Sequence, residues 1–262
     1  MMAMSRLVAQ AVSPETVAKV AQQNPRLEKR FHALLMGDSA SAGSTPESSV
    51  SLMIRLARVA RCVYRGREVE VFQEFYRTPG RDLDLAARLL AELAPGMEPH
   101  KRRTLLLEVV GRVPAGEGYP AVRQLIREPG WDESKCQALA AYFVRVPPGK
   151  FYAQVDLLKD ASKEGQGALP FLVLLWKELH PDLPSPLLVT SDATVHARLI
   201  SSILAAFNRA LGEPWFTDVE IAVFQWGGKG SYEADRKRQP DAQALWPDIQ
   251  RRVQRLIKQH SR

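Results

Sequence analysis

Hydrophobic residues recur at helical spacing along most of the chain, and Pro or Gly interrupts the pattern every fifteen residues or so. The clearest case is segment 51–66, where Leu52, Leu56 and Val59 share one face and arginines occupy the opposite arc. Further short segments of this kind follow one another between residues 49 and 212. The pattern therefore predicts a mainly α-helical fold.

The succession of short helices resembles stacked helical hairpins in its rhythm. Known helical repeats have periods of about 33–47 residues, with key positions that recur in every repeat. The present segments share the rhythm but no recurring positions. We therefore expect an irregular multi-helix domain, with a stack of helical hairpins as the alternative.

Two segments show the alternation that is typical of strands. In segment 215–226, Val219, Ile221 and Val223 alternate with polar or small residues. Segment 67–75 alternates in the same way and would pair with it, or else extend the preceding helix. A minor two-stranded β element is therefore expected on the helical body.

Composition divides the chain into four parts. Residues 1–37 predict a small arm of two helices, and residues 38–49 are small and polar, which is typical of a flexible linker. The helical core domain is expected over 50–228, and a basic C-terminal segment and helix over 229–262.

The chain carries no signal for a membrane span, a metal site or a disulfide framework. No apolar run approaches the roughly 18 residues that a spanning helix needs, and the start lacks the apolar stretch of a secretory signal. Cys62 and Cys136 are far apart, and the histidines lack zinc-like spacing. We expect a cytoplasmic protein with no cofactor and no metal.

The positive charge of the chain is concentrated near its end. Residues 229–262 contain nine Lys or Arg and four Asp or Glu, a net charge of +5 out of +7 for the whole chain. A clustered excess of this kind attracts phosphates or acidic surfaces, whereas a diffuse excess mostly supports solubility.

The terminal helix is expected to have two faces. On a helical wheel, Trp246, Ile249 and Val253 share an apolar arc, which predicts a contact with the body or with a partner protein. Pro247 suits the first turn of this helix. The basic residues lie on the far side of the wheel, where they are either a solvated face or a binding face.

The candidate nucleic-acid contacts are basic residues of two regions, chosen because the planar guanidinium of Arg can donate two hydrogen bonds to one phosphate. The first set lies in and just before the terminal helix and consists of Arg236, Lys237, Arg238, Arg251, Arg252, Arg255 and Lys258. The second set is Arg55, Arg58 and Arg61. No sequence-reading motif accompanies them, so contact with backbone phosphates is expected.

One short motif points to a different function. Arg255 and His260 are separated by four residues in RLIKQH, a spacing similar to the Rx4–6H signature of HEPN-type RNases, which are helical and usually dimeric. The resemblance implies that Arg and His stabilise charge and transfer protons while a 2′-hydroxyl attacks. It covers six residues, and Leu256 departs from the polar residue that usually follows the arginine.

Taken together, these features predict a non-enzymatic binding or assembly protein. Its helical body would contact protein partners in a complex, and its basic C-terminal segment would contact nucleic-acid phosphates. The alternatives are a protein scaffold with no nucleic-acid role, and a HEPN-like RNase that uses Arg255 and His260.

Overall fold

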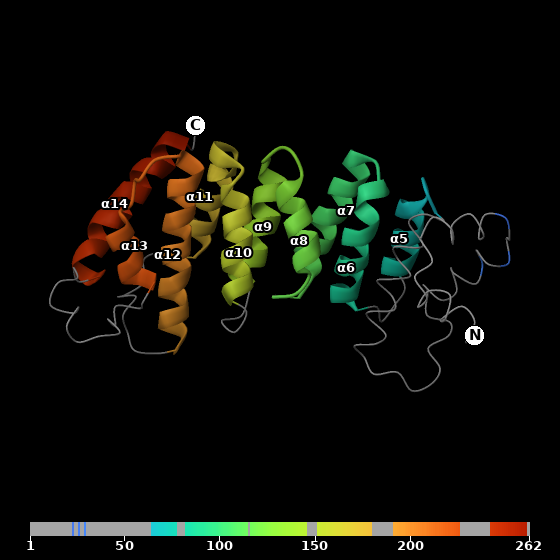
Figure 1. Ribbon diagram of the computed structural model, residues 1–262, viewed down its shortest axis with the longest axis horizontal. Helices are drawn as coiled ribbons and strands as arrows, with labels where there is room; N and C mark the ends of the chain where they lie inside the picture. Colours follow the sequence, from blue (N-terminus) through green and yellow to red (C-terminus); the bar gives the residue numbers. More distant parts are fainter. Residues whose placement is uncertain are drawn as a thin grey trace. The chain divides into compact units, whose positions relative to one another are not determined.

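The described part of the chain is almost entirely helical (Figure 1). The structure is a computed structural model, and it describes residues 64–77, 82–114, 116–145, 151–179, 191–225 and 242–260, together with Gln23, Arg26 and Lys29. The predicted mainly α-helical fold is confirmed. None of the helices in these ranges is long and apolar enough to cross a membrane.

Contacts between residues divide the chain into two compact units. The first consists of Met1–Val113 with Gly118–Ala121, and the second consists of Pro114–Glu117 with Val122–Arg262. The predicted N-terminal arm lies outside the described residues except for Gln23, Arg26 and Lys29, and the predicted linker 38–49 lies outside them completely.

Within its described residues, the first unit contains three complete α-helices and a short 3-10 turn. These are α5 (Glu68–Arg77), α6 (Leu83–Leu93), the turn Ala94–Gly96 and α7 (Pro99–Arg112). The carboxylate of Asp82 starts α6, because it accepts hydrogen bonds from the backbone N–H groups of Asp84 (2.8 Å) and Leu85 (3.3 Å). Helix α6 packs against both α5 and α7.

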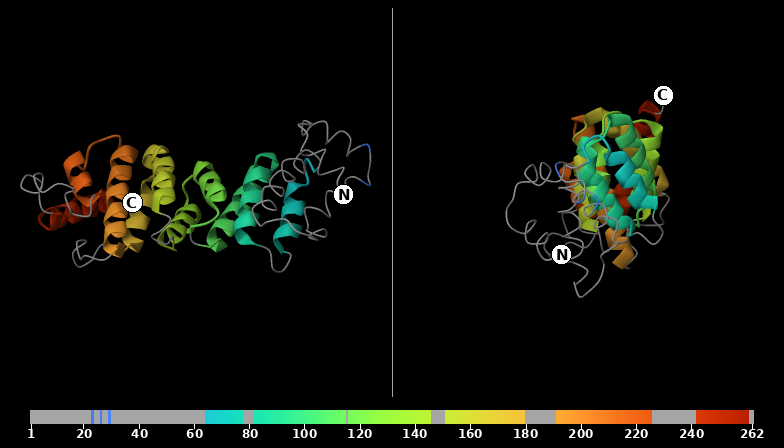
Figure 2. Two further views of the ribbon diagram at one scale, coloured as in Figure 1. Left: turned by 60° about the horizontal axis from the view of Figure 1, so that its bottom comes forward. Right: turned by 90° about the vertical axis from the view of Figure 1, so that its right-hand side faces the viewer.

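Among the described residues, the second unit contains most of α8 (Tyr119–Arg127), followed by α9 (Glu133–Arg145), α10 (Phe151–Ser162), a 3-10 turn (Gly165–Ala168), α11 (Leu169–Glu178), α12 (Ser191–Leu211), α13 (Asp218–Gln225) and α14 (Ala242–His260). Helix α9 packs on α11, and α10 packs on α12, so these two helices lie beside the second helix after them, whereas α12 packs on the consecutive helix α13. Figure 1 and the left-hand view of Figure 2 both show α10 next to α12. Helices α11 and α13 together support α14.

The long helix α12 buries an apolar stripe at helical spacing. Leu199, Ile203, Phe207 and Ala210 are all buried. Gly212 follows the helix with a φ of 71°, a left-handed conformation that ends helices and that glycine adopts at least cost.

The predicted two-stranded element is wrong for both of its segments, because residues 218–225 form α13 and residues 68–77 form α5. A capping box explains α13. The backbone N–H of Thr217 donates to the carboxylate of Glu220 (2.8 Å), and the backbone N–H of Glu220 donates to the Thr217 hydroxyl (3.3 Å). In the helix, Val223 is buried while Val219 is 54% exposed, so the alternating valines do not share a face.

The predicted start of the terminal helix also needs correction. Helix α14 begins at Ala242, so Pro247 lies inside the helix and not in its first turn. The preceding residues include Ala242, Ala244 and Leu245, which have high helix propensity and extend the helix toward the N-terminus. Proline removes only one hydrogen bond of the helix ladder at this place.

Candidate functional site

Helix α14 is fixed to the second unit by its apolar face. Ile249 and Val253 are fully buried, and Trp246 is 8% exposed. The indole of Trp246 packs on Trp176 of α11 and on Phe224 of α13, with ring centres 5.8 Å and 5.6 Å away. The three residues that the sequence proposed for a protein interface are therefore covered by the chain's own helices.

Arg252 also contacts other residues of the second unit. Its guanidinium pairs with the carboxylate of Glu220, donates to the backbone carbonyl of Trp215 (2.7 Å) and lies 2.9 Å from the carboxylate of Asp248. It also lies over the ring of Phe216, 5.1 Å from the ring centre. Because its side chain is only 17% exposed and its terminal nitrogens are held by Glu220 and Trp215, Arg252 links α14 to α13 and offers little to an external phosphate.

Glu220 is the acidic half of this link, and its carboxylate is 13% exposed. Burial alone would raise the pKa of Glu220, but hydrogen bonds from Arg252 and Thr217 favour the ionised form. The result is a pKa below the ordinary value of a glutamate. Glu220 is therefore ionised at neutral pH and keeps Arg252 turned inward.

Three basic residues on the outer face of α14 are placed differently. Arg251, Arg255 and Lys258, here called the basic row, are all exposed. Arg251 pairs with the neighbouring Asp248 at 3.3 Å, and its side chain is 73% exposed. Within the described ranges, Arg255 and Lys258 take part in no ion pair. The basic row is therefore open to an anionic partner.

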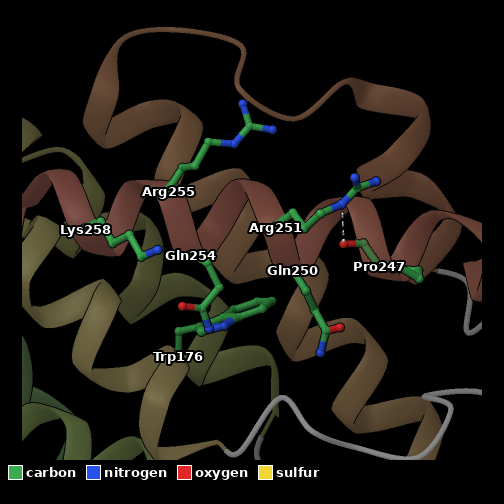
Figure 3. A pocket seen from close by; sticks show the side chains of 7 residues that line it. All are labelled: Trp176, Pro247, Gln250, Arg251, Gln254, Arg255 and Lys258. Atoms are coloured by element: carbon green, nitrogen blue, oxygen red, sulfur yellow. Dashed lines mark hydrogen bonds between the residues drawn. The ribbon is translucent and has the colours of Figure 1, made fainter.

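The basic row borders an open groove of about 540 Å³ between α14 and α11 (Figure 3). Its lining consists of the basic row together with Trp176, Pro247, Gln250 and Gln254. In Figure 3, Gln250 and Gln254 point toward the side of Trp176, while Arg251 and Arg255 point away from it. The groove therefore has basic side chains along one edge and the amides of Gln250 and Gln254 along its wall. The Trp176 indole also borders it, although only 2% of Trp176 is exposed.

The remaining candidates from the sequence fall outside the described residues. These are Arg236, Lys237 and Arg238 before α14, and Arg55, Arg58 and Arg61 near the start of the chain. His260 ends α14, but its side chain is not described, so the Arg255–His260 pair stays a prediction.

The sequence did not indicate the groove residues Trp176, Gln250 and Gln254. The two glutamines are four residues apart, and this spacing alone would have placed them on one side of α14. Trp176 comes from a helix about seventy residues earlier in the chain, so no spacing within α14 indicates it. Among the described side chains, no group of three His, Cys, Asp or Glu is placed to hold a metal ion. Neither the family models, the curated proteins nor the solved structures give a match to this chain.

Proposed function

We propose that this chain is a non-enzymatic binding or assembly protein whose helical body contacts protein partners and whose basic row contacts nucleic-acid phosphates. The observation that carries the proposal is that different residues of α14 fix the helix in place and project basic groups from it. The apolar face and Arg252 fix the helix in place, while Arg255 and Lys258 project from it without ionic partners among the described residues.

The spacing of the basic row supports contact with a regular polyanion. Arg251, Arg255 and Lys258 are four and three residues apart, so they extend over about 10 Å of the helix axis. A nucleic-acid strand carries a phosphate about every 3.4 Å of duplex axis, so two or three phosphates lie within reach of the row. Each contact releases condensed counterions, which makes binding favourable and salt-dependent.

Charge reversal tests this proposal better than truncation, because removing α14 would expose the core that Ile249 and Val253 fill. We expect Arg251→Glu/Arg255→Glu to raise the Kd for single-stranded RNA, single-stranded DNA and duplex DNA by on the order of ten- to a hundredfold at low salt. Fluorescence anisotropy with labelled oligonucleotides measures these constants.

The matched control is Lys159→Glu/Lys163→Glu, in α10 and in the turn directly after it, which changes the net charge by the same amount at two exposed lysines. The control should change the Kd several-fold less than the α14 variant. Equal effects of the two variants would mean that only the overall charge matters, and would contradict a site on α14. If the unaltered chain binds no nucleic acid at low salt, the scaffold alternative is favoured, and cleavage of RNA that depends on His260 would favour the RNase alternative.

A further inference from the structure

We infer that the ligand of the α14 groove is a single-stranded nucleic acid whose phosphates lie on the basic row while a base enters the groove beside Gln254. The inference rests on the proposed function, because it requires the basic row to bind phosphates. Beyond the proposed function, it specifies that the nucleic acid is single-stranded and that the groove holds one of its bases.

The side chains of the two arginines point away from the groove, whereas Lys258 leans toward Gln254 (Figure 3). In Figure 3, Arg251 and Arg255 point to one side of α14, whereas Gln254 points to the side where Trp176 lies. In a single strand, the phosphates and the bases project from opposite sides of the sugars. Such a strand can place its charges on the arginines and a base in the groove at the same time.

Gln254 has the functional group that a base needs. Its carboxamide offers a donor and an acceptor side by side, which matches the edge of an unpaired base. The side chain is exposed, and it makes no hydrogen bond to another described residue. Binding a base would therefore not require it to give up an existing contact within the described part of the chain.

The size and lining of the groove also favour a base over a lone phosphate. Its volume of about 540 Å³ lies in the range of roughly 300–1,000 Å³ that is usual for sites of small organic ligands. Pro247 is exposed and adds apolar surface, which a planar ring can contact and a phosphate cannot use, whereas the Trp176 indole is only 2% exposed and adds little to this surface.

A duplex or an acidic peptide satisfies only part of this site. A duplex keeps its pairing edges occupied, so it would bind through the basic row alone. An acidic peptide can place carboxylates on the basic row and pair a backbone amide with Gln254, but its acidic side chains carry no flat ring for the exposed surface of Pro247. The combination of cations, a carboxamide and apolar surface therefore fits a nucleotide strand best.

The test compares a short oligothymidylate with an abasic strand of the same length, which keeps the phosphates and lacks the bases. We expect the unaltered chain to bind the oligothymidylate on the order of tenfold more tightly than the abasic strand. We expect Gln254→Ala to abolish this preference while the Kd for the abasic strand stays the same. Fluorescence anisotropy on the full chain gives both constants.

Two controls separate this inference from the proposed function. Gln259→Ala changes an exposed glutamine of α14 that does not line the groove, and it should keep the preference. Arg251→Glu/Arg255→Glu should weaken binding of both strands alike. Equal binding of the two strands by the unaltered chain, with both weakened by the charge reversal, would overturn the inference and leave the proposed function standing.

Three other outcomes would overturn the inference, and two of them would overturn the proposed function as well. A preference for bases that survives in Gln254→Ala would show that the base is bound elsewhere, and would overturn the inference. Failure to bind either strand would overturn the inference and the proposed function together. Binding of a polyglutamate peptide in place of both strands would do the same, and would identify the basic row as a protein contact.

Discussion

Replacing Lys135 with methionine is expected to lower the free energy of unfolding by about 2–4 kcal/mol. Lys135 lies near the start of α9 and has no exposed surface. Its ammonium group donates hydrogen bonds to the backbone carbonyls of Ile126 (2.8 Å) and Glu128 (2.5 Å) and lies 3.9 Å from the ring centre of Trp131.

The effect is large because these carbonyls lie at the C-terminal end of α8, where the last C=O groups have no partner within the helix and carry partial negative charge. Lys135 supplies both the donors and the compensating positive charge, and the Trp131 ring adds a cation–π contact to the fully buried ammonium group. Methionine fills a similar volume but donates nothing, so two buried carbonyls lose this donor.

Chemical denaturation followed by circular dichroism measures the change in unfolding free energy. The matched control is Lys159→Met on α10, whose side chain is 54% exposed and should contribute no more than about 0.5 kcal/mol. Equal effects of the two substitutions would contradict a structural role for the buried lysine.

Replacing Arg252 with alanine is expected to cost about 2–4 kcal/mol of unfolding free energy, whereas Arg251→Ala should cost less than about 0.5 kcal/mol. The two arginines are neighbours in sequence but differ in exposure, with side chains 17% and 73% exposed. Without Arg252, the partly buried carboxylate of Glu220 and the carbonyl of Trp215 lose their charged donor. Thermal or chemical unfolding of the two variants distinguishes these roles directly.

The cost of losing Arg252 should also depend on pH. The pKa of Glu220 in the folded chain is below its ordinary value of 4.5, so the unfolded chain takes up a proton first as the pH falls. The stabilisation that the Arg252–Glu220 ion pair provides is therefore complete at neutral pH and begins to fall near pH 4.5. It is lost as the pH falls through the folded-state pKa of Glu220. A difference between the original chain and Arg252→Ala that stays constant from pH 7 to pH 3 would contradict the ion pair.

Periodicity predicted most of the fold, and it failed where a segment was short. The stripe of α12 repeats from Leu199 to Ala210, about three turns, and a pattern of this length favours a helix. Helix α13 has only eight residues, and its valines and isoleucine fit a strand equally well when hydrophobicity alone is considered. The decisive signal was local, since Thr217 and Glu220 have the spacing of a capping box.

The helical wheel of α14 separated the buried face from the basic face, but it could not separate Arg252 from Arg251 and Arg255. Arg252 lies at the edge of the basic arc, and its partner Glu220 is 32 residues away in sequence. Trp176 reaches the groove from α11. Contacts of this kind depend on how helices pack, and no spacing within one helix predicts them.

The central claim is that the basic row binds nucleic-acid phosphates, and the salt dependence of binding tests it most directly. We would measure the Kd for oligothymidylate over a series of salt concentrations, for the unaltered chain and for Arg255→Gln. With three phosphate contacts, log Kd should rise against log salt with a slope of about 2, and Arg255→Gln should lower the slope by about 0.7–1. A slope near zero, or one that Arg255→Gln leaves unchanged, would contradict phosphate binding by the outer face of α14.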